Sequence, residues 1–152
     1  MPTPMRGARV ERTASDDTVR EWTLASDVQA IGPVVQMVQR MCEAAGFSAR
    51  QCALQVPVAL TEALANAIQC GASDASVRVR VEIAADTLHI AVHDSGGGFD
   101  LDRCTEGPDS ANWLDREDGR GVFLMRALMD RVESEVVPQQ DGHTLRLQLR
   151  RS

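Results

Sequence analysis

Residues 88–100 read LHIAVHDSGGGFD, and this stretch decides what kind of fold the chain can form. Leu88, Ile90 and Val92 alternate with other residues, which predicts a strand with one buried face. Asp94 then stands at the strand end, directly before three glycines that offer no side chains to pack. A flexible turn would need these glycines for its shape alone. The alternative is a seat for a flat ring against bare backbone at Gly96 and Gly98, with Asp94 accepting a hydrogen bond from an amine on the ring.

The surrounding sequence predicts the strands that complete this sheet. SVRVRVEI at 76–83 alternates strictly and, across the turn AADT, predicts a hairpin with 88–92. TVREWTLAS at 18–26 predicts a first strand, although its alternation is imperfect. ESEVV at 133–137 and TLRLQLR at 144–150 predict a second hairpin near the end of the chain.

Apolar residues at helical spacing predict three helices: 31–45, 48–69 and 119–132. Ser48 and Gln51 have the spacing of a capping box at the start of the second helix. Pro57 lies inside that helix and removes a backbone hydrogen bond, so we expect a kink or a break there. This order of elements predicts an α+β, two-layer sandwich with helices on one face of a mixed, mainly antiparallel sheet.

The chain of 152 residues is long enough for one domain with its own core. Residues 1–17 carry no apolar period and predict a flexible tail, which leaves 18–152 as a single domain. A long polar loop is expected at about 100–118. No apolar run approaches the roughly 20 residues that cross a bilayer, and the start lacks a secretory core, so we expect a cytoplasmic protein without membrane contact.

The charged residues exclude several classes of protein. A net charge of −6 argues against a broad basic face for direct nucleic-acid binding. All 16 basic residues are arginines, so the chain has no lysine for a Walker-type phosphate loop or a eukaryotic-type kinase core. The four cysteines lack the paired spacing of a zinc site, and we expect reduced, structural thiols.

TEALANAIQCGA at 61–72 places an acid and an amide on one helical face, because Glu62 and Asn66 are four residues apart. A solvated polar face would explain this pair. If the pair is buried, it needs a polar partner, and a Mg²⁺–phosphate assembly is one that suits it.

DGRGVFLM at 118–125 places a glycine-bracketed arginine at the start of a predicted helix. The first-turn N–H groups of a helix have no internal partner and attract anions, phosphate above all. Arg120 would reinforce such a contact. The alternative is a glycine-containing loop before a core helix.

Together and in this order, the three stretches resemble the ATP-binding fold shared by DNA gyrase, Hsp90, histidine kinases and the mismatch-repair protein MutL. Glu62 and Asn66 match the asparagine box of that superfamily. Asp94 to Gly98 match its D-x-G-x-G motif, and Gly119 to Gly121 match its G-x-G motif. TEALANAI, DSGGGFD and GRGVFLMRALMDRVE are each similar to the versions found in bacterial anti-sigma-factor serine-protein kinases. Cys70 departs from that group, many members of which have a histidine there.

The resemblance implies a role for each matching residue. Glu62 would be the general base or orient the acceptor hydroxyl, and Asn66 would bind the Mg²⁺ that bridges the phosphates of ATP. Asp94 would bind the amino group of adenine, helped by Thr144 through a water molecule. Phosphates would be held by the remaining positions, Gly119, Arg120, Gly121 and Val122, under a lid at about 100–118.

The function implied by the resemblance is an ATP-dependent serine/threonine-protein kinase that also acts as an anti-sigma factor. Its partners would be a sigma factor and a small anti-sigma-factor antagonist that accepts the phosphate, and the chain would form a homodimer. Two alternatives stay open: an ATP-binding module without catalysis that only holds partners, and a stand-alone catalytic domain of the histidine-kinase type. For the histidine-kinase alternative, the sequence offers no upstream helical His-Glu or His-Asp pair that could serve as an internal phosphate acceptor.

Overall fold

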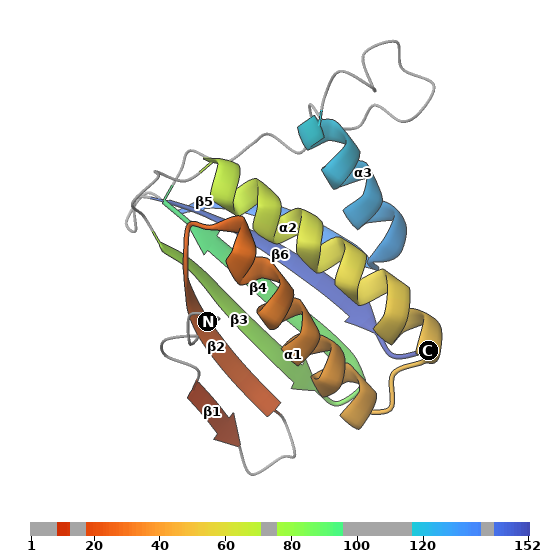
Figure 1. The fold of residues 1–152 in the computed structure, drawn as a ribbon. Coiled ribbons are helices and arrows are strands. Elements are labelled where there is room, and N and C mark those ends of the chain that lie inside the picture. Colours follow the sequence, from red (N-terminus) through yellow and green to blue (C-terminus); the bar gives the residue numbers. More distant parts are fainter. Residues whose placement is uncertain (1–8, 13–17, 71–75, 96–116, 138–141) are drawn as a thin grey trace.

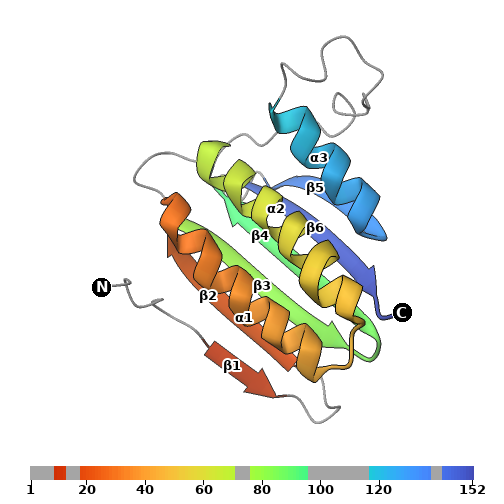
Figure 2. The ribbon, with the colours of Figure 1, turned by 45° about the vertical axis from the view of Figure 1, so that its right-hand side comes forward.

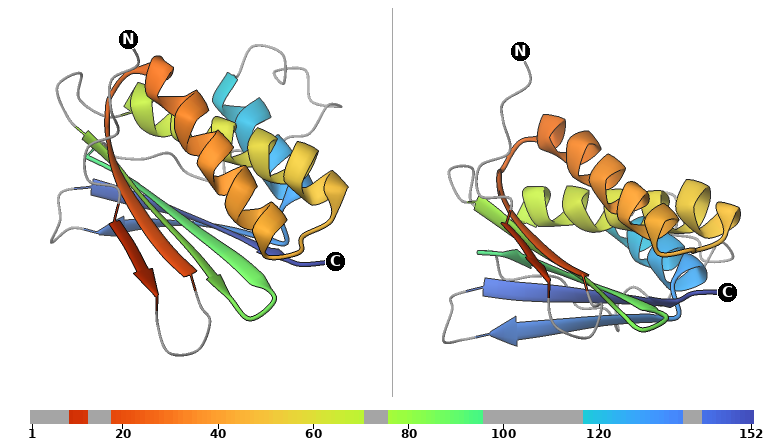
Figure 3. Two further views of the ribbon diagram at one scale, coloured as in Figure 1. Left: turned by 60° about the horizontal axis from the view of Figure 1, so that its bottom comes forward. Right: turned by 90° about the horizontal axis from the view of Figure 1, so that it is seen from below.

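Helices and sheet form two layers. The structure, a computed structural model, describes residues 9–12, 18–70, 76–95, 117–137 and 142–152. Three helices lie side by side over one face of the sheet (Figure 1), and the view from below in Figure 3 separates the helical layer from the sheet. The predicted α+β sandwich is therefore confirmed.

Six strands make up the sheet in the order β1-β2-β3-β4-β6-β5, and every neighbouring pair is antiparallel. The sheet is therefore not mixed within the described residues. β1 corrects the predicted flexible tail, because Arg9–Arg12 pair with β2 at the sheet edge visible in Figure 2. The strands are β1 (Arg9–Arg12), β2 (Thr18–Ala25), β3 (Ser76–Ala84), β4 (Thr87–Asp94), β5 (Arg131–Val137) and β6 (Gly142–Arg150).

The helices are α1 (Ile31–Ala44), α2 (Val56–Cys70) and α3 (Glu117–Leu128). The predicted third helix, 119–132, therefore begins and ends too late. The Asp130 N–H donates to the Gln148 carbonyl of β6, which draws the chain into β5 and places Val132 in a strand. Within the described residues, no helix has both the length and the apolar character needed to cross a bilayer.

The core lies between the two layers. Strand alternation turns one set of side chains toward the helices, where they are almost fully excluded from water. Each such apolar side chain contributes about 1.5–3 kcal/mol through burial. From the sheet the core receives Trp22, Leu24, Val77, Val79, Val81, Leu88, Ile90, Val92, Leu145 and Leu147; from the helices it receives Val34, Val38, Leu60, Ala63, Leu64, Val122 and Met125.

The capping box and the effect of Pro57 are both confirmed at the start of the second helix. Ser48 N–H donates to Gln51 Oε1, and Gln51 N–H donates to Ser48 Oγ, both at 3.1 Å. Gln51–Gln55 form a π-helical turn, in which Val56 N–H donates to the Gln51 carbonyl. A wider turn relieves the clash of the Pro57 ring with the carbonyl four residues earlier. The axis of α2 is thus set after an irregular turn.

Two cysteines fit the predicted structural role. Cys42 and Cys52 are free and buried. Burial raises the pKa of Cys42 to about 12, and burial followed by the nearby Glu43 charge raises the pKa of Cys52. Both thiols are therefore protonated at neutral pH and behave as small apolar groups. The other two predicted thiols, Cys70 and Cys104, have side chains outside the described set.

Gln51 ties the start of the helical unit to the end of the chain, so its loss should destabilise the fold. Its Oε1 also accepts from Ser152 N–H, and its Nε2 donates to the Arg150 carbonyl at 2.8 Å. We expect Gln51→Ala to lower the free energy of unfolding by about 2 kcal/mol, because it removes a cap and leaves buried groups unpaired. Urea denaturation measures this. The exposed Gln36 of α1 provides the control: Gln36→Ala should change stability by no more than about 0.5 kcal/mol.

Candidate functional site

An acid and an amide on α2 lie against the first turns of α3. Glu62 is half-buried and Asn66 is buried, with 6% of its surface exposed. A Cβ atom built on Gly121 of α3 would lie 2.9 Å from Glu62 Oε2 and 3.3 Å from Asn66 Nδ2. The two predicted motifs therefore meet. Only a residue without a side chain lets α3 approach these polar groups so closely.

The amide of Asn66 is chemically unusual in this position. Its Nδ2 is shielded from water and has no hydrogen-bond partner among the described residues. Leaving a buried polar donor unpaired costs about 1–3 kcal/mol, and most native structures avoid it. An orphaned amide beside a carboxylate, next to a glycine, indicates a place prepared for a polar ligand rather than for packing. This arrangement does not fit the solvated polar face that was the simpler interpretation of Glu62 and Asn66.

Asp94 ends β4 on the face of the sheet that the helices cover. Its side chain is buried, and its Oδ2 lies 3.4 Å from Nδ1 of His143, which is its direct cross-strand neighbour on β6. The other ring nitrogen, Nε2, is in hydrogen-bond contact with Oγ of Ser134 on β5. Asp94 is thus held by a chain of polar groups that crosses three strands.

The expected pairing of Thr144 with Asp94 is corrected by the strand register. Residues 143 and 144 point to opposite faces, so Thr144 lies on the helix-free face, opposite the side to which Asp94 points. There its Oγ1 is 2.9 Å from His93 Nδ1. Both residues line an open hollow of about 250 Å³ together with three arginines, Arg78, Arg80 and Arg146. Burial, and then the charge of Arg78, lowers the pKa of His93.

The beginning of α3 differs from the predicted loop-then-helix arrangement. Because the helix already begins at Glu117, Gly119 and Arg120 lie in its first turn, at the end of the helix whose dipole attracts anions. Gly121 and Val122 lie beyond that turn, so their amides fall inside the helical hydrogen-bond pattern. Val122 is fully buried in the core. A phosphate contact from the helix start in this structure is therefore limited to the first two of the four predicted residues.

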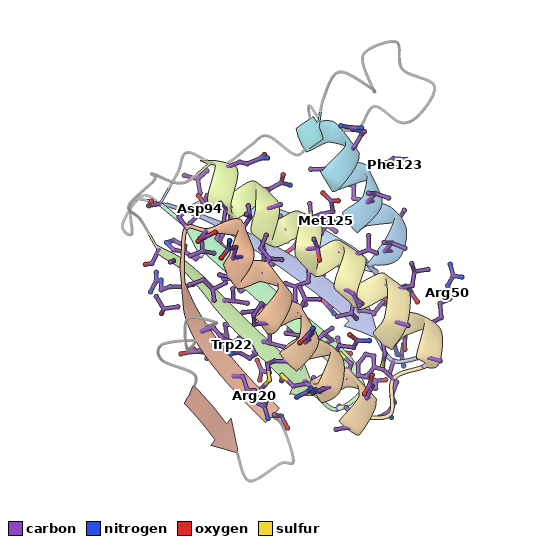
Figure 4. The ribbon with its side chains drawn as sticks, viewed as in Figure 1. Arg20, Trp22, Arg50, Asp94, Phe123 and Met125 are labelled. Atoms are coloured by element: carbon purple, nitrogen blue, oxygen red, sulfur yellow. The ribbon has the colours of Figure 1, made fainter. Side chains whose placement is uncertain are left out.

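Some predicted positions are outside the described residues. Gly96 and Gly98 are among them, and so is the lid at about 100–118 apart from its last two residues, which begin α3. The described parts of the three motifs share one end of the molecule: the end of β4, the C-terminal half of α2 and the start of α3 (Figures 1 and 2). Figure 4 shows Asp94 at this end, well away from the Arg50 end of α2.

The sequence also matches a known protein family over most of its length. The family model described as the histidine kinase-like ATPase domain matches residues 24–149. The chain belongs to this family.

Two curated relatives of this ATPase domain carry the same name, serine-protein kinase RsbW. One, from Bacillus pumilus (strain SAFR-032), is 40% identical over 86 residues, and one from Bacillus velezensis (strain DSM 23117 / BGSC 10A6 / LMG 26770 / FZB42) is 36% identical over 84 residues. Each alignment covers 50% of this chain and spans 53% and 52%, respectively, of the relatives' own length.

His143 and Ser134 are the polar residues that sequence reasoning missed at this site. The signal was the alternation of β6: His143 has the same parity as the apolar Leu145 and Leu147, which marks it as facing the helices. What the sequence did not supply was the pairing of β6 with β4, which brings His143 beside Asp94.

Gly142 should be essential to this end of the sheet. A Cβ atom there would lie 2.3 Å from the Asp94 carbonyl oxygen and 2.7 Å from His93 Nε2, so the backbone itself must shift. We expect Gly142→Ala to lower the free energy of unfolding by about 1–3 kcal/mol in chemical denaturation.

The matched control is Gly32→Ala in α1, where nothing lies within 4 Å of the added Cβ. This change should alter stability by no more than about 1 kcal/mol, because the preference of alanine for helix is offset by its neighbour Pro33, which disfavours a helical residue with a side chain before it. Equal effects of the two substitutions would contradict the close approach of β4 and β6.

Proposed function

We propose that the protein is an ATP-dependent serine/threonine-protein kinase that phosphorylates a small partner protein and, in another state, holds a sigma factor. The observation that carries the proposal is the buried Nδ2 of Asn66, which has no hydrogen-bond partner in the described part of the chain and lies with Glu62 against Gly121. The family match supports an ATP site, and the printed names of the two relatives support protein phosphorylation. Because those relatives are matched over about half their length, the partners belong to the proposal.

The residues around Asn66 fit Mg²⁺ bound together with nucleotide phosphates. Mg²⁺ prefers oxygen ligands and is commonly bound through one or two protein groups, with phosphates and water completing its shell. The amide oxygen of Asn66 is such a group, and the neighbouring Glu62 adds negative charge on the same helical face. When bound, the metal would neutralise phosphate charge during phosphoryl transfer.

Glu62 is placed to act on the acceptor. It is half-buried, so its carboxylate is partly sheltered yet reachable, and it precedes Asn66 by one helical turn. In the proposed reaction it orients the serine or threonine hydroxyl of the partner and accepts its proton. A protein that only holds ATP would not need a carboxylate here.

Binding of the rest of the nucleotide is assigned to two further places. Asp94 accepts a hydrogen bond from the amino group of adenine, with Gly96 and Gly98 leaving space for the ring. The first turn of α3, at Gly119 and Arg120, attracts the phosphates through the helix dipole and the arginine charge. Asp94 thus selects the base, while the start of α3 contributes affinity for any nucleotide.

The acceptor is proposed to be a separate protein, an anti-sigma-factor antagonist. His89 is exposed on the helix-free face, and His93 and His143 lie in strands, so none of the three stands on a helix like the acceptor of a histidine kinase. We further propose a cytoplasmic homodimer that exchanges this antagonist for a sigma factor. The printed names of the two relatives support the kinase activity, and the assembly belongs to the proposal.

Glu62→Gln should separate binding from catalysis. The amide keeps the size of the carboxylate but cannot take a proton, so we expect ATP affinity within a few-fold of the wild type and phosphoryl transfer reduced by about 10²–10⁴-fold. Transfer of labelled phosphate to the partner, captured from the native bacterium with and without ATP, measures this. Glu43→Gln, at an exposed position of α1, is the control. Transfer at the wild-type rate by the Glu62 variant would reject the assigned role, and ATP binding without any transfer by the wild type would favour a non-catalytic module.

Asn66→Ala should have opposite effects on the two states of the protein. The nucleotide-free protein should become more stable by about 1 kcal/mol, because an unpaired buried donor is removed. Affinity for ATP should fall about tenfold or more when Mg²⁺ is present, and much less when it is chelated. Calorimetric titration in both conditions, beside thermal denaturation, gives the comparison. An equal loss of affinity with and without Mg²⁺ would show that Asn66 does not hold the metal.

A further inference from the structure

Three polar side chains form a continuous chain on the helix-covered face, at the end of the sheet that holds Asp94. Oδ2 of Asp94 lies 3.4 Å from His143 Nδ1, and Oγ of Ser134 contacts His143 Nε2. The register explains the contacts. Asp94 and His143 are direct cross-strand partners, while Ser134 on the next strand pairs with Leu145 and so lies diagonally from His143 on the same face.

Two members of this chain, Asp94 and His143, are buried among apolar neighbours, and Ser134 is partly buried. The side chains of Asp94 and His143 retain 4% and 1% of their exposure, and Val92 and Leu145 flank them on the same face. A buried acid and imidazole usually add little stability compared with apolar residues of similar volume. Their presence in the core therefore calls for a reason other than packing.

The directions of the two hydrogen bonds follow from the chemistry of the groups. A carboxylate can only accept a hydrogen bond, so the contact with Asp94 requires a proton on Nδ1, and in a neutral ring Nε2 is then free to accept from the Ser134 hydroxyl. Nδ1–H then donates to Asp94. Asp94 thus selects the tautomer, Ser134 holds the ring at its other nitrogen, and His143 in turn fixes the orientation of the carboxylate. Serine hydrolases link the same three groups to activate the serine; here the group proposed to meet the ligand is the aspartate.

We propose that His143, held by Ser134, is the positioning residue for Asp94, and that it makes the site select a purine with an amino group at C6. The inference rests on the proposed ATP site. A carboxylate fixed by His143 presents its acceptor lone pairs in one direction, which suits an amine donor. A purine with a carbonyl oxygen at C6 presents an acceptor to the buried carboxylate of Asp94. Two acceptors cannot form a hydrogen bond, so the carboxylate is left without a donor from the base.

The test compares ADP with inosine diphosphate, which differs at C6 in carrying oxygen instead of the amine. Dissociation constants are measured by calorimetric titration for the full chain. The wild type should bind ADP at least about tenfold more tightly than the inosine nucleotide. His143→Ala should weaken the binding of ADP by about tenfold and the binding of inosine diphosphate by much less. The dissociation constant of inosine diphosphate divided by that of ADP should therefore fall toward one.

Two conservative variants separate positioning from packing. In His143→Asn, the side-chain amide stands near the place of Nδ1 and can still donate to Asp94, so the ADP preference should be largely restored. In His143→Gln, the side-chain amide stands near the place of Nε2, so it can contact Ser134 but cannot reach Asp94. The preference for ADP over inosine diphosphate should therefore stay low. Ser134→Ala should give an intermediate ratio. His89→Ala, on the exposed helix-free face, is the control.

Each outcome decides between the two proposals. If the wild type binds neither nucleotide, the proposed ATP site itself is rejected. If it prefers ADP and the ratio is unchanged in both His143→Ala and His143→Gln, the positioning role is overturned while the ATP site stands. If every His143 variant loses affinity for both nucleotides by the same factor, and its melting temperature falls in parallel, His143 has a structural role only. The inference is then likewise overturned.

Discussion

The close approach of α3 to α2 at Gly121 is the constraint on which the site depends. Without a side chain at this position, the two helices meet with Glu62 and Asn66 between them, and any larger residue would press on these polar groups. The contact joins two segments that are far apart in the sequence. It leaves Nδ2 of Asn66 buried without a hydrogen-bond partner among the residues that the structure describes, at a cost of about 1–3 kcal/mol. A locally destabilised polar group is characteristic of binding sites, where the ligand completes the missing interaction.

The antiparallel register decides which polar groups serve which face. The end of β4 and the start of β6 carry two acceptor–histidine pairs, Asp94 with His143 on the covered face and Thr144 with His93 on the open face. A shift of one residue would exchange them and place a threonine beside the carboxylate. Gly142 prevents such slippage, because it lies so close to the Asp94 carbonyl that no other residue fits.

The position of Asn66 also depends on how α2 begins. Pro57 is accommodated by the π-helical turn before it, and the side chains of that turn anchor it at two distant points. Gln51 holds the last residues of the chain, and Nε2 of Gln55 donates to the Leu128 carbonyl at the end of α3 at 2.9 Å. The irregular turn thus ties the start of α2 to the end of β6 and to the end of α3, and these contacts constrain the angle at which the Glu62 face meets α3.

Most of the elements and their faces were readable from sequence, because alternation and helical spacing report burial locally. β1 was missed because RVER contains one apolar residue and so has no period to detect. The predicted third helix extended too far because Val132 continues its apolar stripe. In the structure, the hydrogen bond from Asp130 N–H to β6 ends the helix before Val132. Both errors concern backbone bonds to another strand, which the apolar period of a segment does not report.

The sequence by itself determined the two-layer architecture, the three motifs and their order, since each depends on neighbouring residues and their spacing. Only the tertiary structure decided which side chains meet: Gly121 with Glu62 and Asn66, and His143, rather than Thr144, with Asp94. The physical reason is that strand register and helix approach are set by packing across the whole core. No local pattern specifies the partner of a side chain on another element.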